Sequence, residues 1–304
     1  MDRHQSSLIE RIQALKEKRN AVILAHNYQA GEVQDVADYL GDSLELSQRA
    51  ASSDAEVVVF CGVRFMAETA SILCPNKKVL TPDLNAKCPM ANMITSESLR
   101  NLKQKWKNAP VVCYVNTTAE VKAESDVCCT SANAVKVVAN EAAPQVIFVP
   151  DKYLAHYVST KTEKKIIPWQ GFCPTHVRIL PEHIQNQKIL HPRAEVMVHP
   201  ECTPPVIALA DEVLSTGGMC KHAASSQSDE FIVGTEVGML YRLSKENPSK
   251  RFFAASPLAV CPNMKSITLE KVLWSLEDLK HEVTVPSEIR VKARSAVEKM
   301  LRIR

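Results

Sequence analysis

The chain has 304 residues, of which 45% are hydrophobic, so it is long enough for about two domains with a sizeable core. Its 37 basic and 34 acidic residues leave a net charge of +3, which argues against nucleic acid or an acidic membrane surface as a partner. The N-terminal segment lacks the apolar core of a secretory signal, and no apolar run reaches the roughly 18 residues that span a bilayer. We therefore expect a cytoplasmic protein, in which ten cysteines indicate metal binding, catalysis or burial rather than disulfides.

The first segment of the chain alternates between predicted helices and strands. An amphipathic helix in residues 1–20 precedes an apolar run, and residues 33–40 again have helical spacing. A helix with Asp42 or Ser43 as its N-cap follows. The remaining predicted elements before Cys88 are a strand at 56–62, a helix at 64–73 and a strand at 78–81. This alternation predicts βαβ units and a parallel sheet.

The same order of elements occurs twice more along the chain. In the second segment, predicted strands at 111–117, 126–130, 145–151 and 165–170 alternate with helices and lead to Cys173. In the third segment, predicted strands at 195–201, 213–215, 230–236 and 251–256 lead in the same way to Cys261. In all three places the cysteine is followed by proline.

The spacing of equivalent residues shows that these segments are repeats. The residues that end the first strands, His26, Tyr114 and His199, are separated by 88 and then 85 positions. The same two separations relate Ser43, Ser131 and Thr216, where the second strand of each segment meets its helix. The three cysteines are separated by 85 and 88 positions. The period of about 86 residues is longer than that of solenoid repeats, so each repeat is a small domain-like unit.

The repeat predicts the fold class. We expect an α/β protein of three small α/β/α sandwich units with parallel sheets, arranged around a pseudo-threefold axis with the active site at the centre. The units would span residues 1–95, 96–180 and 181–304. Residues 266–304 predict two amphipathic helices split near Pro286, which we expect to pack over the last unit.

The predicted site lies where the three units meet. In open parallel sheets, ligands bind beyond the carboxyl ends of the strands, where helix N-termini present their N–H groups. All the equivalent positions lie at such ends. One central cavity would therefore collect a set of polar residues and three cysteines: His26, Tyr28, Ser43, Tyr114, Asn116, Ser131, His199, Glu201 and Thr216, with Cys88, Cys173 and Cys261.

The three Cys-Pro cysteines are candidate metal ligands. No CxxC pair or CxxCxxC run is present, so the spacing excludes a zinc ribbon and a ferredoxin. Three thiolates from separate units can still bind a [4Fe–4S] cluster, whose fourth iron stays open as a Lewis acid. Zinc held by three cysteines and a histidine, or simple burial of each thiol, are the alternatives. The other seven cysteines are best explained by burial.

The polar residues have structural and functional interpretations. Ser43, Ser131 and Thr216 would serve as N-caps, or together bind carboxylates or phosphate at three helix N-termini. His26 and His199 are either structural or anion-binding. Glu201 is a candidate general base. Tyr28 and Tyr114 are candidate proton donors, although a tyrosine at a strand end often only packs.

The motifs together resemble those of the quinolinate synthase family. The resemblance covers about residues 18–285 and rests on LAHNYQ, GDSLEL, FCGVRFMAETA, CPMANM, YVNTTAEVKA, TSANAV, PDKYLAHYV, HPEC and STGGM. It implies a triplicated α/β fold and condensation of iminoaspartate with dihydroxyacetone phosphate to give quinolinate, phosphate and two waters, in NAD biosynthesis. It also implies one [4Fe–4S] cluster per chain, held by Cys88, Cys173 and Cys261.

The resemblance also assigns roles to individual residues. Tyr28, Tyr114 and Glu201 would be catalytic, with Tyr28 matching a mobile active-site tyrosine. The substrate-binding residues would be His26, Ser43, Tyr114, Val115, Asn116, Ser131, His199, Pro200, Glu201 and Thr216. Some relatives have a further CxxC pair near the C-terminus that can form a regulatory disulfide. Here no cysteine follows Cys261, so we expect that switch to be absent.

Other functions compete with this one. The first is a non-enzymatic iron–sulfur or zinc sensor, but a sensor needs an output surface, and the chain shows no basic DNA-reading helix. The second is another [4Fe–4S]-dependent hydro-lyase, since an open iron suits any dehydration of a hydroxy acid. The expected partners are the two small substrates. Transient contact with the enzyme that makes the unstable iminoaspartate is a further hypothesis.

Overall fold

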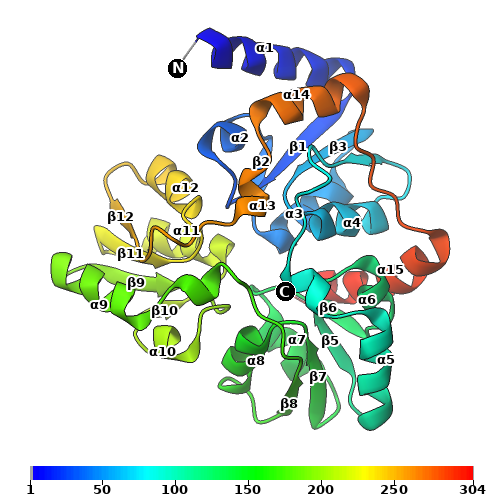
Figure 1. The fold of residues 1–304 in the computed structure, drawn as a ribbon, viewed down its shortest axis with the longest axis vertical. Helices are drawn as coiled ribbons and strands as arrows, with labels where there is room; N and C mark the ends of the chain where they lie inside the picture. The colour runs from blue at the N-terminus through cyan, green and yellow to red at the C-terminus, as the bar shows by residue number, and fades with distance from the viewer. Residues whose placement is uncertain (1–2, 304) are drawn as a thin grey trace.

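In a computed structural model, residues 3–303 of the chain are described, and they form three α/β units around a common centre (Figure 1). Each unit contains one parallel four-stranded sheet with helices on its faces. The expected α/β fold of three repeated units is therefore confirmed. The boundaries proposed at 95/96 and 180/181 remain a prediction.

The elements follow in the same order in each unit. The first unit consists of α1 (Arg3–Lys18), β1 (Ala21–His26), α2 (Gly31–Asp35), β2 (Tyr39–Gly41), α3 (Ser43–Ser52), β3 (Val57–Cys61), α4 (Arg64–Leu73), β4 (Lys78–Leu80) and the 3₁₀ helix η1 (Met90–Met93). The second consists of α5 (Ser96–Lys105), β5 (Val111–Tyr114), α6 (Ala119–Ala123), β6 (Val127–Cys129), α7 (Ala134–Asn140), β7 (Gln145–Val149), α8 (Lys152–Ser159), β8 (Lys165–Pro168) and η2 (His176–Arg178).

The third unit and the C-terminal segment complete the chain. Their elements are α9 (Pro181–Leu190), β9 (Glu195–Val198), α10 (Pro204–Ile207), β10 (Glu212–Val213), α11 (Thr216–Ser225), β11 (Glu230–Gly234), α12 (Met239–Glu246), β12 (Arg251–Ala254), α13 (Pro262–Lys265), α14 (Leu269–Asp278) and α15 (Ser287–Arg302).

The three sheets have one topology. Their strand orders are β2-β1-β3-β4, β6-β5-β7-β8 and β10-β9-β11-β12. In each, the chain leaves the first strand toward one edge and returns on its other side. The crevice beyond the carboxyl ends of the first and third strands is therefore a ligand site by topology. His26, the last residue of β1, lies at such an end, as do Tyr114 on β5 and the residues just after β9.

Local sequence explains where the helices begin. Asp42 is the N-cap of α3: its carboxylate accepts hydrogen bonds from the backbone N–H groups of Leu44 and Glu45, and Glu45 completes a capping box. The helix expected over residues 33–40 is wrong in extent. It stops at Asp35, and Tyr39–Gly41 instead forms β2, in parallel register with Leu24–His26 of β1. Pairing with β1 outweighs the helical spacing here.

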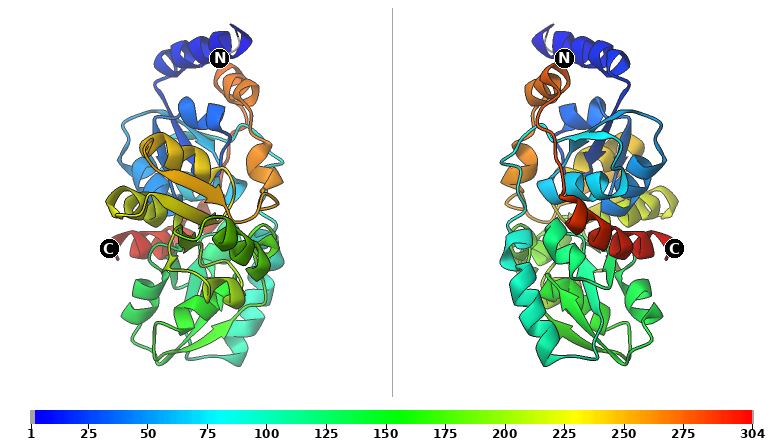
Figure 2. Two further views of the ribbon diagram at one scale, coloured as in Figure 1. Left: turned by 90° about the vertical axis from the view of Figure 1, so that its left-hand side faces the viewer. Right: turned by 90° about the vertical axis from the view of Figure 1, so that its right-hand side faces the viewer.

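The two C-terminal helices are present and α15 has Pro286 as its N-cap, but they do not pack over the last unit. The apolar face of α14 lies against α1 and the first sheet, where Leu273 and Leu276 join Ile12 in one buried cluster. Helix α15 packs against α4, α6 and β6, between the first and second units (Figure 2). An amphipathic pattern predicts a buried face but does not identify the surface that covers it.

The end of α15 is fastened to the second unit. The side-chain amide of Asn133 donates hydrogen bonds to the carbonyl oxygens of Met300 and Ile303, at 3.3 and 3.5 Å. Its Oδ1 accepts from the backbone N–H of Thr130. These contacts hold the turn that carries Ser131 between β6 and α7. None of the helices within residues 3–303 has the length and apolar character needed to cross a membrane.

Candidate active site

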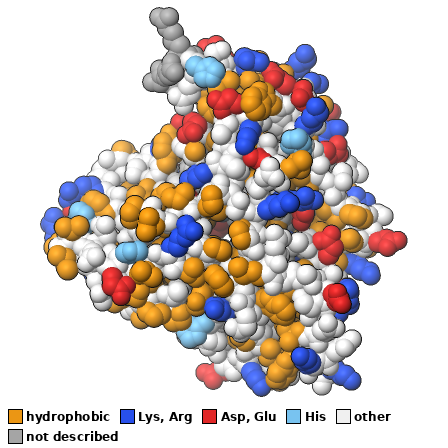
Figure 3. Space-filling view, in the orientation of Figure 1, with side chains coloured by type: hydrophobic (Ala, Val, Ile, Leu, Met, Phe, Trp, Pro, Cys, Tyr) orange, Lys and Arg blue, Asp and Glu red, His pale blue; other side chains and the backbone are white. Residues whose placement is uncertain are grey.

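A cavity of about 240 Å³ lies where the three units meet. Figure 3 shows a hollow near the centre of the face seen in Figure 1, with hydrophobic side chains around it. The cavity wall contains most of the predicted site residues: His26, Tyr28, Ser43, Cys88, Tyr114, Asn116, Ser131, Cys173, His199, Glu201, Thr216 and Cys261. Val115 and Pro200 are buried beside the site and are not among its lining residues.

Three of the ten cysteines are distinguished by their exposure. Cys88, Cys173 and Cys261 are half-buried and face the cavity, whereas the other seven are buried. All ten thiols are free. Three half-buried thiols from three units, facing one cavity, are therefore candidate ligands of an inorganic centre.

The turn after each of these cysteines is the same. A proline comes next, and the chain enters a short helix: η1 after Cys88, η2 after Cys173 and α13 after Cys261. Because proline fixes φ near the helical value, the next backbone N–H groups point back at the sulfur. Each sulfur accepts from two of them: Met90 and Ala91, Thr175 and His176, or Asn263 and Met264. Such N–H groups stabilise a thiolate.

Burial opposes ionisation of these thiols when no cation is near. Burial, with smaller contributions from Glu201 and Cys261, raises the pKa of Cys88 to about 12. It also raises the pKa values of Cys173 and Cys261. A bound metal centre reverses this balance, because its positive charge deprotonates a coordinating thiol.

The polar side chains that line the cavity form its polar wall, and Glu201 is the ionised group among them. Burial would raise its pKa, but the charge and hydrogen bond of His176, with His199 and Tyr114, lower it to about 2. One oxygen, Oε1, accepts a 2.6 Å hydrogen bond from the Tyr114 hydroxyl. The other, Oε2, lies 2.8 Å from Nδ1 of His176. Glu201 is therefore an anion whose two oxygens are held by Tyr114 and His176.

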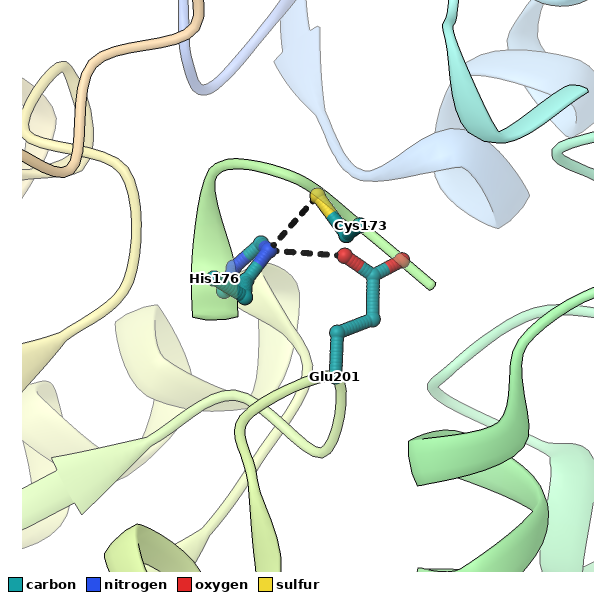
Figure 4. A group of neighbouring side chains, drawn as sticks. All are labelled: Cys173, His176 and Glu201. Carbon is teal, nitrogen blue, oxygen red and sulfur yellow. Dashed lines mark hydrogen bonds and ion pairs between the residues drawn. The ribbon is translucent and has the colours of Figure 1, made fainter. Parts of the chain in front are cut away.

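His176 is a site residue that the sequence analysis missed. It lies three residues after Cys173 in the same turn, and its Nδ1 is 3.2 Å from that sulfur. Figure 4 shows Cys173, His176 and Glu201 pointing toward one another from two separate segments. Its presence in the GFCPTH turn was the available signal, but its repeat counterparts are Ala91 and Met264, so the repeat did not reveal it.

A second missed residue, Thr235, joins His176 to Tyr28. The Tyr28 hydroxyl lies 2.6 Å from Oγ1 of Thr235, which lies 2.8 Å from Nε2 of His176. A continuous chain of hydrogen bonds therefore runs from Tyr28 through Thr235, His176 and Glu201 to Tyr114. Burial raises the pKa values of both tyrosines well above 10, so each carries its proton at neutral pH.

The two strand-end histidines are neutral. Burial lowers the pKa of His26 and of His199 to about 3, against the opposing effect of Glu201. In His199, Nδ1 accepts from the backbone N–H of Glu201 at 3.3 Å, so the ring proton is on Nε2. That N–H donates to the Ser131 hydroxyl oxygen at 3.1 Å. In His26, Nδ1 accepts from the backbone N–H of Tyr28, which leaves Nε2–H to donate elsewhere.

Comparison with known proteins identifies the family. The family model "Quinolinate synthetase A protein" matches residues 10–302. The chain belongs to the quinolinate synthase family. It is 59% identical to the quinolinate synthase of Dehalococcoides mccartyi strain CBDB1 over 300 residues, which is 99% of each chain. It is 56% identical to that of Methanosarcina barkeri, again over 99% of each chain, and 52% identical to that of Geobacter sp. strain M21 over 98% of each.

Membership of the quinolinate synthase family implies an iron–sulfur cluster. The donors on the cavity wall suit one, because they are thiols whose sulfurs already accept backbone N–H groups. A mixed group formed by Cys173, His176 and Glu201 also has its ligand atoms within 4.8 Å of one another. Glu201 is already hydrogen-bonded to Tyr114 there, which makes it better suited to proton transfer than to ligation.

Proposed function

We propose that this chain makes quinolinate by condensing iminoaspartate with dihydroxyacetone phosphate, with loss of phosphate and two waters, in NAD biosynthesis. The observation that carries the proposal is the convergence of three half-buried cysteines and an ionised glutamate in one cavity. It is supported by identities of 52–59% to proteins named quinolinate synthase over nearly the whole chain.

Cys88, Cys173 and Cys261 would hold one [4Fe–4S] cluster. Three cysteine ligands leave one iron of such a cluster open, and when bound it supplies a Lewis acid for a substrate oxygen or nitrogen. The turn after each cysteine contributes two N–H groups to the sulfur, which lowers the cost of holding negative charge there. The reaction needs no net electron transfer.

The polar wall would bind the anionic groups of both substrates. Thr216 begins α11 and Ser43 begins α3, so carboxylate or phosphate oxygens near their hydroxyls also meet helix N-termini. Ser131, His26, His199 and Asn116 add further polar contacts from the other sides. Val115 and Pro200 would act through their backbone positions. Holding two substrates in one cavity converts a bimolecular condensation into a reaction between positioned groups.

Glu201 would be the general base. It is ionised, and the Tyr114 hydroxyl and the His176 ring already lie in hydrogen-bond contact with its two oxygens. After it accepts a proton from a substrate carbon, Tyr114 and Tyr28 are placed to donate protons to leaving or rearranging oxygens. The chain of hydrogen bonds through His176 and Thr235 connects the two tyrosines. A proton that Glu201 accepts on one side of the cavity would therefore be available to Tyr28 on the other.

We further propose that the protein works in the cytoplasm, where its ten cysteines would stay reduced. Because iminoaspartate is unstable, brief contact with the enzyme that supplies it would shorten its exposure to water.

The test combines metal analysis with an assay. Protein purified without oxygen should contain iron and acid-labile sulfide in about equal amounts, and should form quinolinate from the two substrates. Bound zinc without sulfide would contradict the cluster. An iron–sulfur protein that forms no quinolinate but dehydrates a hydroxy acid would instead favour the hydro-lyase alternative.

A further inference from the structure

Thr216 has a hydroxyl whose orientation decides what it can bind. It is buried at the first position of α11, and its side chain lies on the cavity wall. A hydroxyl has one proton and two lone pairs, so it can donate to a substrate oxygen only if no protein group takes that proton. The neighbours of Thr216 therefore determine whether it is a donor or an acceptor toward an anion.

Asn27, from the first unit, contacts this hydroxyl across the junction with the third unit. It is fully buried, and its Nδ2 lies 2.9 Å from Oγ1 of Thr216. Its Oδ1 lies 2.6 Å from Nη1 of Arg242 on α12. A guanidinium group can only donate, so the side of Asn27 that faces Arg242 is its oxygen and the side that faces Thr216 is its NH₂ group.

We propose that Asn27, oriented by Arg242, is a positioning residue that fixes the Thr216 hydroxyl as a donor to an anionic substrate group. The Asn27 NH₂ occupies one lone pair of the hydroxyl oxygen, so the hydroxyl proton points into the cavity. A carboxylate or phosphate oxygen there receives a hydrogen bond without first reorienting the hydroxyl. The inference deepens the proposed function and rests on Thr216 as a substrate-binding residue.

The junction between the third and second units shows the same arrangement with a different donor. There Nε2–H of His199 donates to the hydroxyl oxygen of Ser131. In both cases a buried N–H from one unit donates to a hydroxyl oxygen of another unit. Thr216 begins α11, whereas Ser131 lies in the turn that precedes α7. Asn27 is itself held by its backbone: its N–H donates to the carbonyl of Gly41, and its carbonyl accepts from Gln34. A change in its side chain therefore acts mainly on the two groups that the amide contacts.

A double-mutant cycle tests the coupling. Two anions serve as probes: malate, which carries carboxylates, and inorganic phosphate. Their binding is measured by calorimetry on the anaerobically purified, cluster-containing protein. We expect Thr216→Ala to weaken the binding of one of these anions roughly tenfold and Asn27→Ala roughly fivefold. The double variant should bind about as well as Thr216→Ala alone, because Asn27 acts through that hydroxyl. Unchanged binding in Asn27→Ala, or fully additive losses, would overturn the proposal.

Variants of Arg242 separate positioning from general damage. Arg242→Met removes the donor that orients the amide and should weaken anion binding to a similar extent as Asn27→Ala, whereas Arg242→Lys keeps a donor and should restore most of the loss. Arg242 also pairs with Glu246 at 2.7 Å, so Glu246→Gln is the matched control and should bind anions normally. In steady-state assays the losses should appear in KM, with kcat little changed. Equal losses in Glu246→Gln would show a merely structural effect.

The outcomes distinguish this inference from the proposed function. Wild-type protein that makes no quinolinate but shows the coupling of Asn27 to Thr216 in malate or phosphate binding would contradict the proposed function and support the inference. Protein that makes quinolinate but lacks that coupling would support the proposed function and contradict the inference. Wild-type protein that binds neither anion would overturn the inference, whatever the quinolinate assay shows.

Discussion

The cysteine wall and the polar wall of the cavity have different symmetry. The three cysteines lie at equivalent repeat positions, in the same Cys-Pro turn, with the same two backbone N–H groups on each sulfur. The polar wall is less regular: Ser43, Ser131 and Thr216 are alike, but another equivalent set consists of three unlike residues, Tyr28, Asn116 and Glu201. A metal centre with several like atoms can be held by like ligands, whereas two unlike substrates need unlike contacts. Repetition therefore explains the like ligands of the cysteine wall, and divergence of the units explains the unlike contacts of the polar wall.

The largest expected effect comes from removing a ligand from the cysteine wall. Cys173→Ser removes one of three like ligands, so cluster content and quinolinate formation should both fall to background. Cys88→Ser and Cys261→Ser should do the same. Cys74→Ser is the matched control: Cys74 is also followed by proline, but it is buried outside the cavity and should be dispensable for iron binding. Iron and sulfide analysis checks this, and normal iron content in Cys173→Ser would refute the assignment.

The second-largest effect should come from a change in the polar wall. Glu201→Gln keeps the size of the side chain and removes the base, so the rate should fall by about 10²–10⁴-fold. Visible absorption from the cluster should stay intact, because the cysteines are untouched. Asn116→Asp in the same chain would place a carboxylate at the equivalent position of the second unit, and it should not restore activity. Full activity of Glu201→Gln would remove Glu201 from the mechanism.

A change in the core tests how far the units differ away from the cavity. Phe60 and Phe148 occupy equivalent buried positions on β3 and β7, where the third unit has Val233. Phe148→Val gives the second unit the side chain of the third and should reduce the free energy of unfolding by about 1–3 kcal/mol through the cavity it leaves. Urea unfolding measures this. Val233→Ile, which adds volume instead, provides the comparison.

The smallest effect should come from an asymmetric feature outside the cavity. Glu195 contacts His222 and Ser226 in the third unit alone. Partial burial opposes ionisation, but the hydrogen bonds of Ser226 and His222 lower the pKa of Glu195 below 4.5. Its contribution to stability, under about 1 kcal/mol, is therefore present above pH 4.5 and lost as the pH falls through the folded-state pKa. Glu195→Gln should flatten that part of a plot of unfolding midpoint against pH, while activity stays normal.

Much of this architecture could be predicted from spacing. The separations of 88 and 85 residues placed His26, Tyr114 and His199 at equivalent strand ends and predicted three like sheets. His176, Thr235 and Asn27 could not be found in this way, because their counterparts in the other units are residues of a different kind. Their roles depend on contacts between units. The partner surfaces of α14 and α15 were missed for a related reason, since an apolar face does not identify what it packs against.

The attachment of Asn133 to the end of α15 has a consequence for biosynthesis. The carbonyl oxygens of Met300 and Ile303 accept from the residue that holds the Ser131 turn. A ribosome therefore completes the sheet of the second unit long before the contacts that fix this turn are available. The same holds for α1, which precedes all three sheets in the chain, whereas its partner α14 follows the last of their strands. In the order of synthesis, the three sheets therefore come first, and the contacts that hold the Ser131 turn become available only once α15 has been made.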